Sequence, residues 1–365
     1  TCVFYTDKTC RRIPQLKMQV CVRSGISWLR INVQFTMNAN ATVYDLKLKI
    51  CSTYSIPAPN QCLSHKSYPD NEIPNGILIG NFDGVHLGHQ RLFKLAQKYK
   101  KKYNAKIGVI NFDPMPKMFF NKSLKNFRLS SVNQKLNLLK NHDVDFVITK
   151  KFDKIFSKTK SISFVKNILS QKLDARLIFV SNNFKFGYKR EGDVKFLIQN
   201  EVKFNYKVIK PKPLLINNKI VSSSLIRGFL EKGFLSKANK LLNRKWTIEG
   251  IVKKGRQVGK KIGFPTCNID IDDYVLAQPG VYAVSVLRKN NLKSLKGIAN
   301  LGYRPTFNQK KILLEVHLFN FSGNLYNKHL SVNFLKFIRK EKKFKNINEL
   351  KSQIKKDLIT AKKVK

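Results

Sequence analysis

The stretch LIGNFDGVHLGHQRLF, residues 78–93, decides the fold of the central part of the chain. An apolar run ends in a turn rich in Gly, Asn and Asp, and an amphipathic segment follows. This order predicts a buried strand, a tight loop and a helix, with His86 and His89 near the start of that helix. Because a helix start presents unpaired N–H groups and a partial positive charge, the loop suits a phosphate group.

Strand and helix patterns alternate beyond this stretch. Strands are expected at 76–82, 105–112, 144–149 and 175–181, and helices at 88–103, 131–142 and 161–173. Such alternation predicts right-handed crossovers and a parallel sheet covered on both faces, that is, an α/β domain. Ligands of these sheets bind beyond the carboxyl ends of the strands. The 80–89 loop follows the first strand at that edge, where Gly80, Gly84 and Gly88 let the backbone approach a ligand.

The C-terminal third has a different pattern, with short strands separated by turn residues. The strands are expected at 247–255, 280–289, 295–303, 311–321 and 329–340, and they predict an antiparallel β-barrel. A helix over 346–363 follows, with Asn346 or Asn348 as its cap. Residues 238–246 are expected to join the two domains, which gives domains at 73–240 and 241–365.

Two places in the barrel sequence suggest chemistry. Residues 259–271 form a Gly- and Lys-rich loop that leads into Thr266 and Asn268, and a hydroxyl and an amide two residues apart can ligate Mg²⁺ together with phosphate oxygens. Glu315 stands alone among apolar residues on a strand. An isolated carboxylate there is costly unless it is paired or has a catalytic task.

Composition limits the class of protein. With 365 residues and 42% hydrophobic content, the chain is long enough for two domains with cores. It has no apolar run of 18 residues, and its first residues lack the apolar region of a secretory signal. The sequence therefore predicts a cytoplasmic enzyme with no membrane partner.

The net charge of +48 has two interpretations. One is a nucleic-acid or anionic-lipid binder, and the other is a compositional drift toward lysine. Lysines are spread over the whole chain and far outnumber arginines, whereas base recognition and bidentate phosphate contacts favour arginine. Drift is therefore the preferred interpretation, and a nucleic-acid partner is not expected. A positive field would still attract phosphorylated small molecules.

The first 72 residues differ from the rest. They hold five of the six cysteines but no CxxC pair, so free thiols are expected rather than a metal site or disulfides. Within them, MQVCVRSG from Met18 and the stretch from Thr42 onward resemble a ubiquitin-like domain over residues 18–70. The resemblance implies a partial β-grasp extension before the enzyme, and its role is left open.

Residues 80–89, GNFDGVHLGH, resemble the nucleotidyltransferase signature of the prokaryotic bifunctional riboflavin kinase/FMN adenylyltransferases, also called FAD synthetases. NFDPMPKMFF (111–120), RLSS (128–131), NNFKFGYKREGD (182–193) and VSSSLIRGFLEKG (221–233) match further motifs in the same order. The resemblance covers about residue 75 to the C-terminus. It implies a nucleotidyltransferase domain in which His86, His89 and Arg227 are catalytic. It further implies ATP or phosphate binding at Gly80, Asn81, Phe82, Asp83, Gly84, Gly88, Ser222, Ser223 and Ser224, and flavin binding at Asn183, Phe184, Phe186 and Arg190.

The barrel sequence resembles the riboflavin kinase module of the same family. The module has P-T-x-N where this chain has 265–268, and a catalytic glutamate at the position of Glu315. The resemblance implies ATP contacts at Gly259, Lys260, Gly263 and Thr266, and Mg²⁺ as the metal held by Thr266 and Asn268. Three positions depart from the family pattern, namely Asn183, Ser224 and Lys260. Phe184 and Phe186 could line the isoalloxazine ring or belong to the core.

Together these motifs predict an enzyme that phosphorylates riboflavin with ATP to FMN and then adenylylates FMN to FAD, releasing pyrophosphate. Three rival functions remain: an adenylyltransferase with another acceptor, a basic nucleic-acid-binding protein, and a ubiquitin-like interaction protein with an inactive enzyme part. The sequence does not decide the oligomeric state.

Overall fold

The computed structural model describes residues 3–4, 15–24, 27–36, 75–255, 259, 262–271, 273–288, 293–305 and 310–364. The chain divides into two compact units, Thr1–Glu72 and Ile73–Lys365. In the first unit, three strands form an antiparallel sheet in the order β1-β2-β3: β1 (Val3–Phe4), β2 (Gln15–Ser24) and β3 (Ser27–Thr36). The stretch from Thr42 onward that resembles a ubiquitin-like domain lies outside the described residues, so the resemblance stays a prediction.

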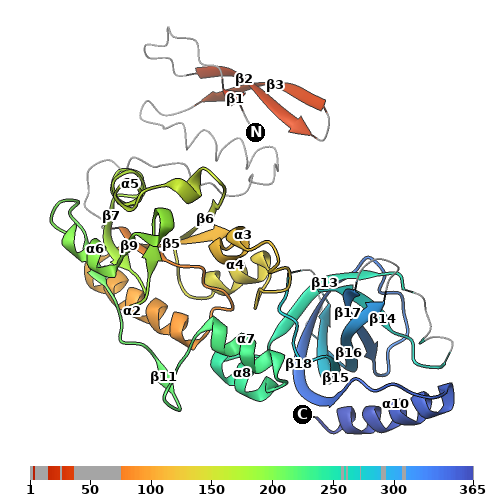
Figure 1. Ribbon diagram of the computed structural model, residues 1–365. Helices are drawn as coiled ribbons and strands as arrows, with labels where there is room; N and C mark the ends of the chain where they lie inside the picture. The colour runs from red at the N-terminus through yellow and green to blue at the C-terminus, as the bar shows by residue number, and fades with distance from the viewer. Residues whose placement is uncertain are drawn as a thin grey trace. The chain divides into compact units, whose positions relative to one another are not determined.

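The second unit begins with the expected parallel sheet, drawn in orange to green in Figure 1. Its strands run in the order β10-β7-β4-β5-β6 and all pair in parallel. The central strand β4 lies between β5 and β7, so the strand order reverses there. The strands are β4 (Asn75–Ile79), β5 (Lys106–Asp113), β6 (Phe146–Lys151), β7 (Ala175–Phe179) and β10 (Lys207–Ile209). All five residues of β4 are buried, as the continuous apolar run predicts.

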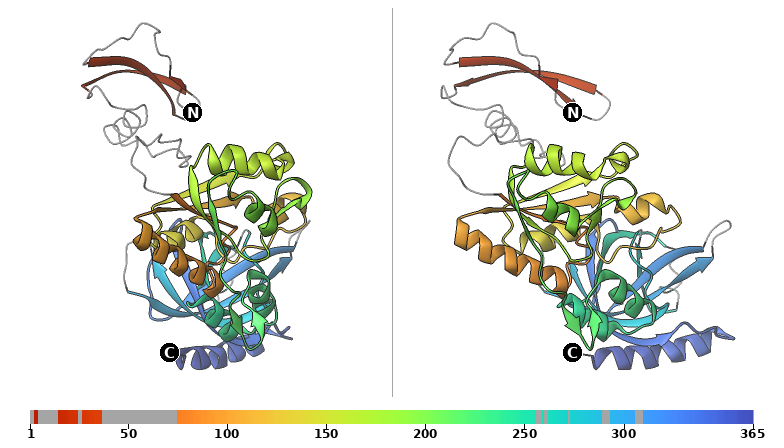
Figure 2. Two further views of the ribbon diagram at one scale, coloured as in Figure 1. Left: turned by 90° about the vertical axis from the view of Figure 1, so that its left-hand side faces the viewer. Right: turned by 60° about the vertical axis from the view of Figure 1, so that its left-hand side comes forward.

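Helices cover both faces of this sheet, as Figures 1 and 2 show. The helix α2 (Leu87–Tyr103) buries Leu92, Phe93 and Ala96 and exposes its lysines. The helix expected at 161–173 is one turn of α5 (Ser161–Ser163) followed by the π-helical segment η2 (Phe164–Ser170). The other helices are α3 (Pro116–Phe120), α4 (Val132–Lys140) and α6 (Val194–Gln199).

A six-stranded closed barrel follows, with every neighbouring pair antiparallel. The strand order is β13-β14-β17-β16-β15-β18. The strands are β13 (Thr247–Lys253), β14 (Cys267–Asp270), β15 (Gly280–Arg288), β16 (Leu295–Pro305), β17 (Lys310–Leu318) and β18 (His329–Lys340). The helix α10 (Ile347–Lys362) packs against β15, β16 and β18, and Asn346 caps it by accepting a hydrogen bond from Glu349 N. The predicted fold class, a parallel-sheet domain followed by an antiparallel barrel, is confirmed.

The expected loop at 259–271 was partly wrong, since residues 267–270 form β14. The letters from Cys267 onward, CNIDID, alternate apolar and polar residues, so the strand pattern is present directly after the Gly- and Lys-rich loop. Strand β10 was not expected either. It has three residues, which is too short for a periodic signal.

Two helices connect the sheet and the barrel. They are α7 (Ser223–Glu231) and α8 (Leu235–Leu242), so the first half of the expected join at 238–246 is helical. Leu230, Leu241 and Trp246 belong to the same hydrophobic cluster as barrel residues such as Phe334. The helix pair therefore packs with the barrel core rather than with the sheet. The domain boundary between residues 240 and 241 stays a prediction.

Candidate active sites

The loop between β4 and α2 lies at the carboxyl edge of the sheet, at the strand where the order reverses. Its residues turn sharply, because Phe82, Gly84 and Val85 all have positive φ angles. A Cβ atom on Gly84 would also come within 2.9 Å of the Leu129 side chain. Glycine is therefore needed at this position for the loop to pack against the protein. The Phe82 side chain is buried against Phe93 and His89, whereas Asn81 is exposed at the rim.

His86 and His89 lie together at the start of α2. His86 is the cap residue, and its Nδ1 accepts a hydrogen bond from His89 N at 3.4 Å. The two rings stack with centroids 3.7 Å apart. Burial, and then the charges of Arg227 and Arg244, lower the pKa of His86 to about 4. His86 is therefore a neutral ring at pH 7, and because Nδ1 accepts, its proton is on Nε2.

Arg227 is buried beside this loop. Its Nη2 donates to Asp83 Oδ2 at 2.7 Å, and its Nε donates to the Phe127 carbonyl at 2.7 Å. The guanidinium lies 3.6 Å from the centre of the Phe127 ring. Burial lowers the pKa of Arg227, although the Asp83 charge opposes this effect. The predicted phosphate contact of Asp83 stays a prediction; its carboxylate accepts hydrogen bonds from Arg227 and from the backbone N–H groups of Leu129 and Ser130.

The three serines at the start of α7, residues 222–224, have different surroundings. Ser222 caps the helix by accepting a hydrogen bond from Leu225 N, and Ser223 Oγ donates to the Asp83 carbonyl at 2.9 Å. Ser224 is exposed. A Cβ on Gly88 would lie 3.2 Å from the Val221 carbonyl, so α7 approaches the start of α2 closely. The structure therefore brings the two motifs, 80–89 and 221–233, together.

The 182–193 segment forms a small hairpin of β8 (Lys185–Phe186) and β9 (Gly192–Asp193). Phe184 stacks on Phe186 with centroids 5.3 Å apart, and Phe186 also contacts Phe164 and Phe196 in the core. Both phenylalanines are half-buried, whereas Asn183 and Arg190 are exposed. The contacts of Phe186 favour the core interpretation, and Phe184 also packs against the same hydrophobic cluster.

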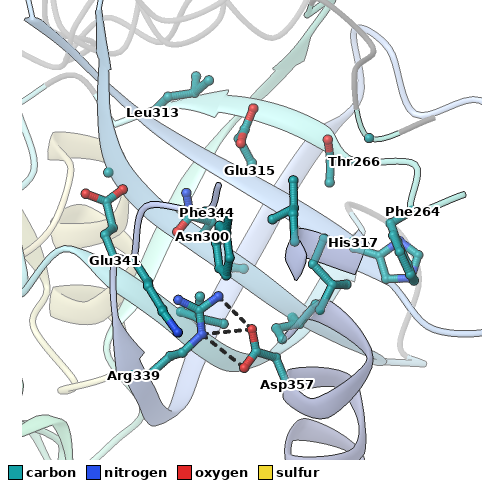
Figure 3. Close-up of a pocket in the computed structure, with 18 of the residues that line it drawn as sticks. Phe264, Thr266, Asn300, Leu313, Glu315, His317, Arg339, Glu341, Phe344 and Asp357 are labelled. Carbon is teal, nitrogen blue, oxygen red and sulfur yellow. Dashed lines mark hydrogen bonds and ion pairs between the residues drawn. The ribbon is translucent and has the colours of Figure 1, made fainter. Parts of the chain in front are cut away.

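A cavity of about 780 Å³ opens in the barrel (Figure 3). Glu315 on β17 lies in register with Asn268 on β14 and Asn300 on β16. With the amide of Asn268 oriented to satisfy both neighbours, its Nδ2 donates to Glu315 Oε1 at 3.2 Å and its Oδ1 accepts from Gly255 N at 3.2 Å. The cavity is of the size that holds a drug-sized ligand. Of the residues predicted from sequence, it is lined by Gly259, Thr266, Asn268 and Glu315.

Comparison with known proteins identifies both domains. A family model described as FAD synthetase matches residues 69–225, and one described as riboflavin kinase matches residues 242–365. The bifunctional riboflavin kinase/FMN adenylyltransferase of Buchnera aphidicola subsp. Schizaphis graminum is 40% identical over 79% of this chain and 93% of its own length. The enzyme of that name from Escherichia coli K12 is 35% identical over 78% of this chain and 91% of its length.

The chain belongs to the bifunctional riboflavin kinase/FMN adenylyltransferase family. The resemblance read from the motifs is thereby confirmed, and the chain has a domain for each step of FAD synthesis by way of FMN. A crystal structure described as a macrolide-efflux protein from Streptococcus pneumoniae shares the fold, with a TM-score of 0.73 at 25% identity over 85% of this chain and 99% of that one. Among the described residues, no helix has the length and apolar character needed to span a bilayer.

The sequence missed several residues of the kinase cavity. Arg339 on β18 donates to Asp357 on α10 from both Nε and Nη2, the shortest distance being 2.7 Å, and Asp357 also accepts from Gln353. Figure 3 shows this pair on the opposite side of the cavity from Glu315 and Thr266. His317 Nδ1 lies 2.8 Å from the Pro265 carbonyl and so fixes the loop before Thr266. The basic stretch FIRKEKKF does not indicate which carboxylate Arg339 meets. Only the contacts in the structure reveal its pair with Asp357.

The remaining predicted kinase residues lie on the loop before β14. The Gly259 carbonyl accepts from Phe264 N at 2.8 Å, which closes a tight turn. Gly263 has a φ of 90°, and no atom lies within 4 Å of the position that a Cβ would take. A glycine is therefore favoured there by the backbone conformation and not by lack of space. Lys260 lies outside the described residues. In the part of the chain that the structure describes, no group of three His, Cys, Asp or Glu residues gathers as a metal site.

Two buried polar atoms near the loop between β4 and α2 have no hydrogen-bond partner among the described residues. They are His89 Nδ1 and Lys135 Nζ. Lys135 on α4 is only 2% exposed, and burial lowers its pKa to about 8. Burial, and then electrostatic interactions with His86 and Lys135, hold the pKa of His89 well below its usual value. The site therefore combines neutral imidazoles with fixed positive charges.

Proposed function

We propose that the barrel cavity phosphorylates riboflavin and that the loop between β4 and α2 adenylylates the FMN produced, with the residue roles given below. The observation that carries the proposal is the placement of Glu315, Asn268 and Thr266 on one wall of a cavity of about 780 Å³. These residue types match what phosphoryl transfer to a hydroxyl group needs, namely a base and oxygen ligands near the phosphates.

In the kinase step, Glu315 accepts the proton of the ribityl 5′-hydroxyl of riboflavin. The hydroxyl oxygen forms a bond to the γ-phosphorus of ATP as the bond from that phosphorus to the bridging oxygen breaks, and FMN and ADP leave. Glu315 is half-buried and lines the cavity together with Asn268 and Asn300. A substrate hydroxyl in the cavity can therefore approach its carboxylate.

Thr266 and Asn268 offer a hydroxyl and an amide oxygen, which are hard donors of the kind that Mg²⁺ prefers. With few protein carboxylates at this position, the metal would be held mainly by ATP phosphates, as is usual for Mg²⁺. When bound there, Mg²⁺ would neutralise the charge that develops on the transferring phosphate. The Gly259 turn and His317 hold the loop that carries Thr266.

In the adenylyl-transfer step, a phosphate oxygen of FMN forms a bond to the α-phosphorus of a second ATP, and pyrophosphate leaves. No base is needed, because the FMN phosphate is already ionised. His86 donates from Nε2, His89 lies stacked on it, and Arg227 supplies a fixed positive charge. Donors aimed at developing charge in a buried site lower the barrier most effectively. Asp83 and Ser223 act as positioning residues for Arg227 and the loop.

For the flavin of this second step, we expect the ring to lie beside the half-buried Phe184, near the exposed Asn183 and Arg190. Phe186 packs with Phe164 and Phe196, which supports a structural role for it. Asn183 and Ser224 depart from the family pattern but keep a polar group at each position, so weakened affinity is the largest effect expected.

We further propose domains at 1–72, 73–240 and 241–365, a cytoplasmic location, and no nucleic-acid partner. The spread of lysines over the whole chain supports drift in composition rather than a binding patch. An adenylyltransferase with another acceptor is disfavoured, because the riboflavin kinase domain supplies FMN to the neighbouring site.

The decisive experiment incubates the purified chain with riboflavin, ATP and Mg²⁺ and separates the flavins over time. We expect FMN to rise first and FAD to follow. Replacing FMN by nicotinamide mononucleotide or phosphopantetheine, with labelled ATP, should give no labelled product. Adenylylation of either compound at the rate of FMN would contradict the proposal, as would release of FAD without any intermediate FMN.

A further inference from the structure

The segment 126–131 connects the barrel to the adenylyl-transfer loop. On one side it pairs with barrel residues that follow β14. The backbone N–H groups of Phe127 and Arg128 both donate to the Asp273 carbonyl at 2.8 Å, and Val275 N donates to the Arg128 carbonyl at 2.7 Å. Asn126 Nδ2 donates to the Tyr274 carbonyl at 3.1 Å. The barrel therefore fixes the backbone of this segment.

The other side of the same segment holds the groups assigned to adenylyl transfer. Two of the three anchors of Arg227 belong to Phe127, one being its carbonyl and the other its ring. The third anchor is Asp83, whose carboxylate accepts from Leu129 N at 3.0 Å. Gly84 N donates to Ser130 Oγ at 3.2 Å. A shift of the segment would therefore move both Arg227 and the loop.

Arg128 has the one side chain of this segment that bridges the two domains by ion pairs. Its Nη2 donates to Asp113 Oδ1 at 2.7 Å, at the end of β5, and its Nε donates to Asp273 Oδ2 at 3.2 Å, in the barrel. The Arg128 side chain is 7% exposed, whereas Asp273 is 56% exposed. The pair with Asp273 is therefore screened by water and contributes little by itself. The planar guanidinium matters because it meets two carboxylates in fixed directions, which a lysine cannot do.

We propose that Arg128 is a positioning residue for adenylyl transfer, which sets the place of Arg227 by fixing segment 126–131 between β5 and the barrel. This inference rests on the proposed role of Arg227. The side-chain hydrogen bonds of Arg128 go to Asp113 and Asp273, so its proposed effect is exerted through the segment and not by contact with a substrate. The barrel thus serves the adenylyl-transfer site as a scaffold, in addition to holding the kinase cavity.

The test measures kcat/KM for FMN-to-FAD conversion and, separately, for riboflavin phosphorylation. Arg128→Gln should lower adenylyl transfer by roughly 10- to 100-fold, since small misplacements of a catalytic group cost this much. The kinase rate should stay within about twofold of the original, as for an uncoupled site. Arg128→Lys should give an intermediate loss. Arg176→Gln is the matched control, since Arg176 forms an exposed pair with Asp174 in the same domain, and it should change neither rate.

A double-mutant cycle with Arg227→Lys separates positioning from general structural damage. If Arg128 acts through Arg227, Arg128→Gln should cost little further activity once Arg227 is replaced. Equal losses in both backgrounds would overturn the inference, and so would a parallel fall of the kinase rate in both Arg128 variants. An Arg227→Lys enzyme with full adenylyl transfer would instead refute the proposed role of Arg227, whatever the result for Arg128.

Discussion

The two sites use their charged side chains in opposite ways. At the adenylyl-transfer loop, Asp83 and Arg227 are buried and paired with each other, and His86 is neutral. In the barrel, Glu315 is half-buried at the wall of an open cavity. The difference follows from the chemistry, because an ionised phosphate nucleophile needs only fixed stabilising charge, whereas a hydroxyl nucleophile needs a carboxylate that it can reach.

The largest expected effect on one site alone comes from Glu315→Gln. The amide keeps the shape of the side chain but cannot take a proton, so kinase activity should fall by about 10²- to 10⁴-fold. FMN-to-FAD conversion should stay near its original rate, because the residues assigned to adenylyl transfer lie at the start of α2 and on α7, whereas Glu315 lies on β17 of the barrel. Separate assays starting from riboflavin and from FMN measure the two steps. Equal losses in both would show that the sites are not independent.

The reciprocal change replaces His86 and His89 together by alanine. Adenylyl transfer should fall by roughly 10²- to 10³-fold, as when donors to a developing charge are removed. Riboflavin should then accumulate as FMN. The cap of α2 is also lost, at a cost of about 1 kcal/mol, so Ser131→Ala, which removes the cap of α4, is the matched control for stability. Undiminished FAD formation by the double variant would place the reaction elsewhere.

Sequence patterns alone predicted the parts of each site that lie close together along the chain. The 80–89 loop could be placed at the carboxyl edge because a buried strand, a glycine-rich turn and a helix follow one another directly. Glu315 was recognised because its neighbours on the strand are apolar. In both cases, neighbouring letters in the sequence show the feature itself. For the loop it is the start of a helix, and for Glu315 it is a lone charge on an apolar strand.

The contacts that hold the sites in place could not be predicted in this way. Arg128 and Asp273 are 145 residues apart, and Arg339 meets Asp357 across a strand and a helix. Arg128 stands in the RLSS motif and Arg339 in a basic strand end, but nothing in either stretch indicates which carboxylate the arginine meets. Asp83 shows the same limit, because the partners of its carboxylate, Leu129 N and Arg227, come from segments far along the chain. Only the packing of distant segments determines such partners.

A smaller effect is expected from Lys135→Met, which tests whether buried charge at the adenylyl-transfer site costs stability. The Lys135 amine is buried with no hydrogen-bond partner among the described residues, so the substitution should raise the free energy of unfolding by about 1 kcal/mol at pH 7. Urea unfolding measures this, with the exposed Lys140→Met on the same helix as control. A loss of stability would mean that the Asp83 and Asp113 charges need this amine.

The same lysine gives a pH dependence with a definite sign. Its pKa is about 8 when folded and 10.5 in its ordinary state, so the unfolded chain binds more protons between these values. Stability from this group therefore rises with pH between about 8 and 10.5 and is constant below about 8. The advantage of Lys135→Met over the original chain should shrink across that interval. An advantage that grows with pH would contradict the lowered pKa.

The smallest effect is expected from removing the first residues, so that the chain starts at Ser67. Every residue assigned to either site lies within Ile73–Lys365, which forms a compact unit by itself. Its first strand, β4, is hydrogen-bonded on both edges, to β5 and β7, and so needs no strand from upstream to complete the sheet. Both rates and the thermal midpoint of the remaining chain should therefore stay close to those of the full chain.

Flavin assays and melting curves on the two proteins would test this. A severe loss of either rate without any change in melting would mean that residues before Ser67 take part in a site, and the two-site comparison would then need a third component.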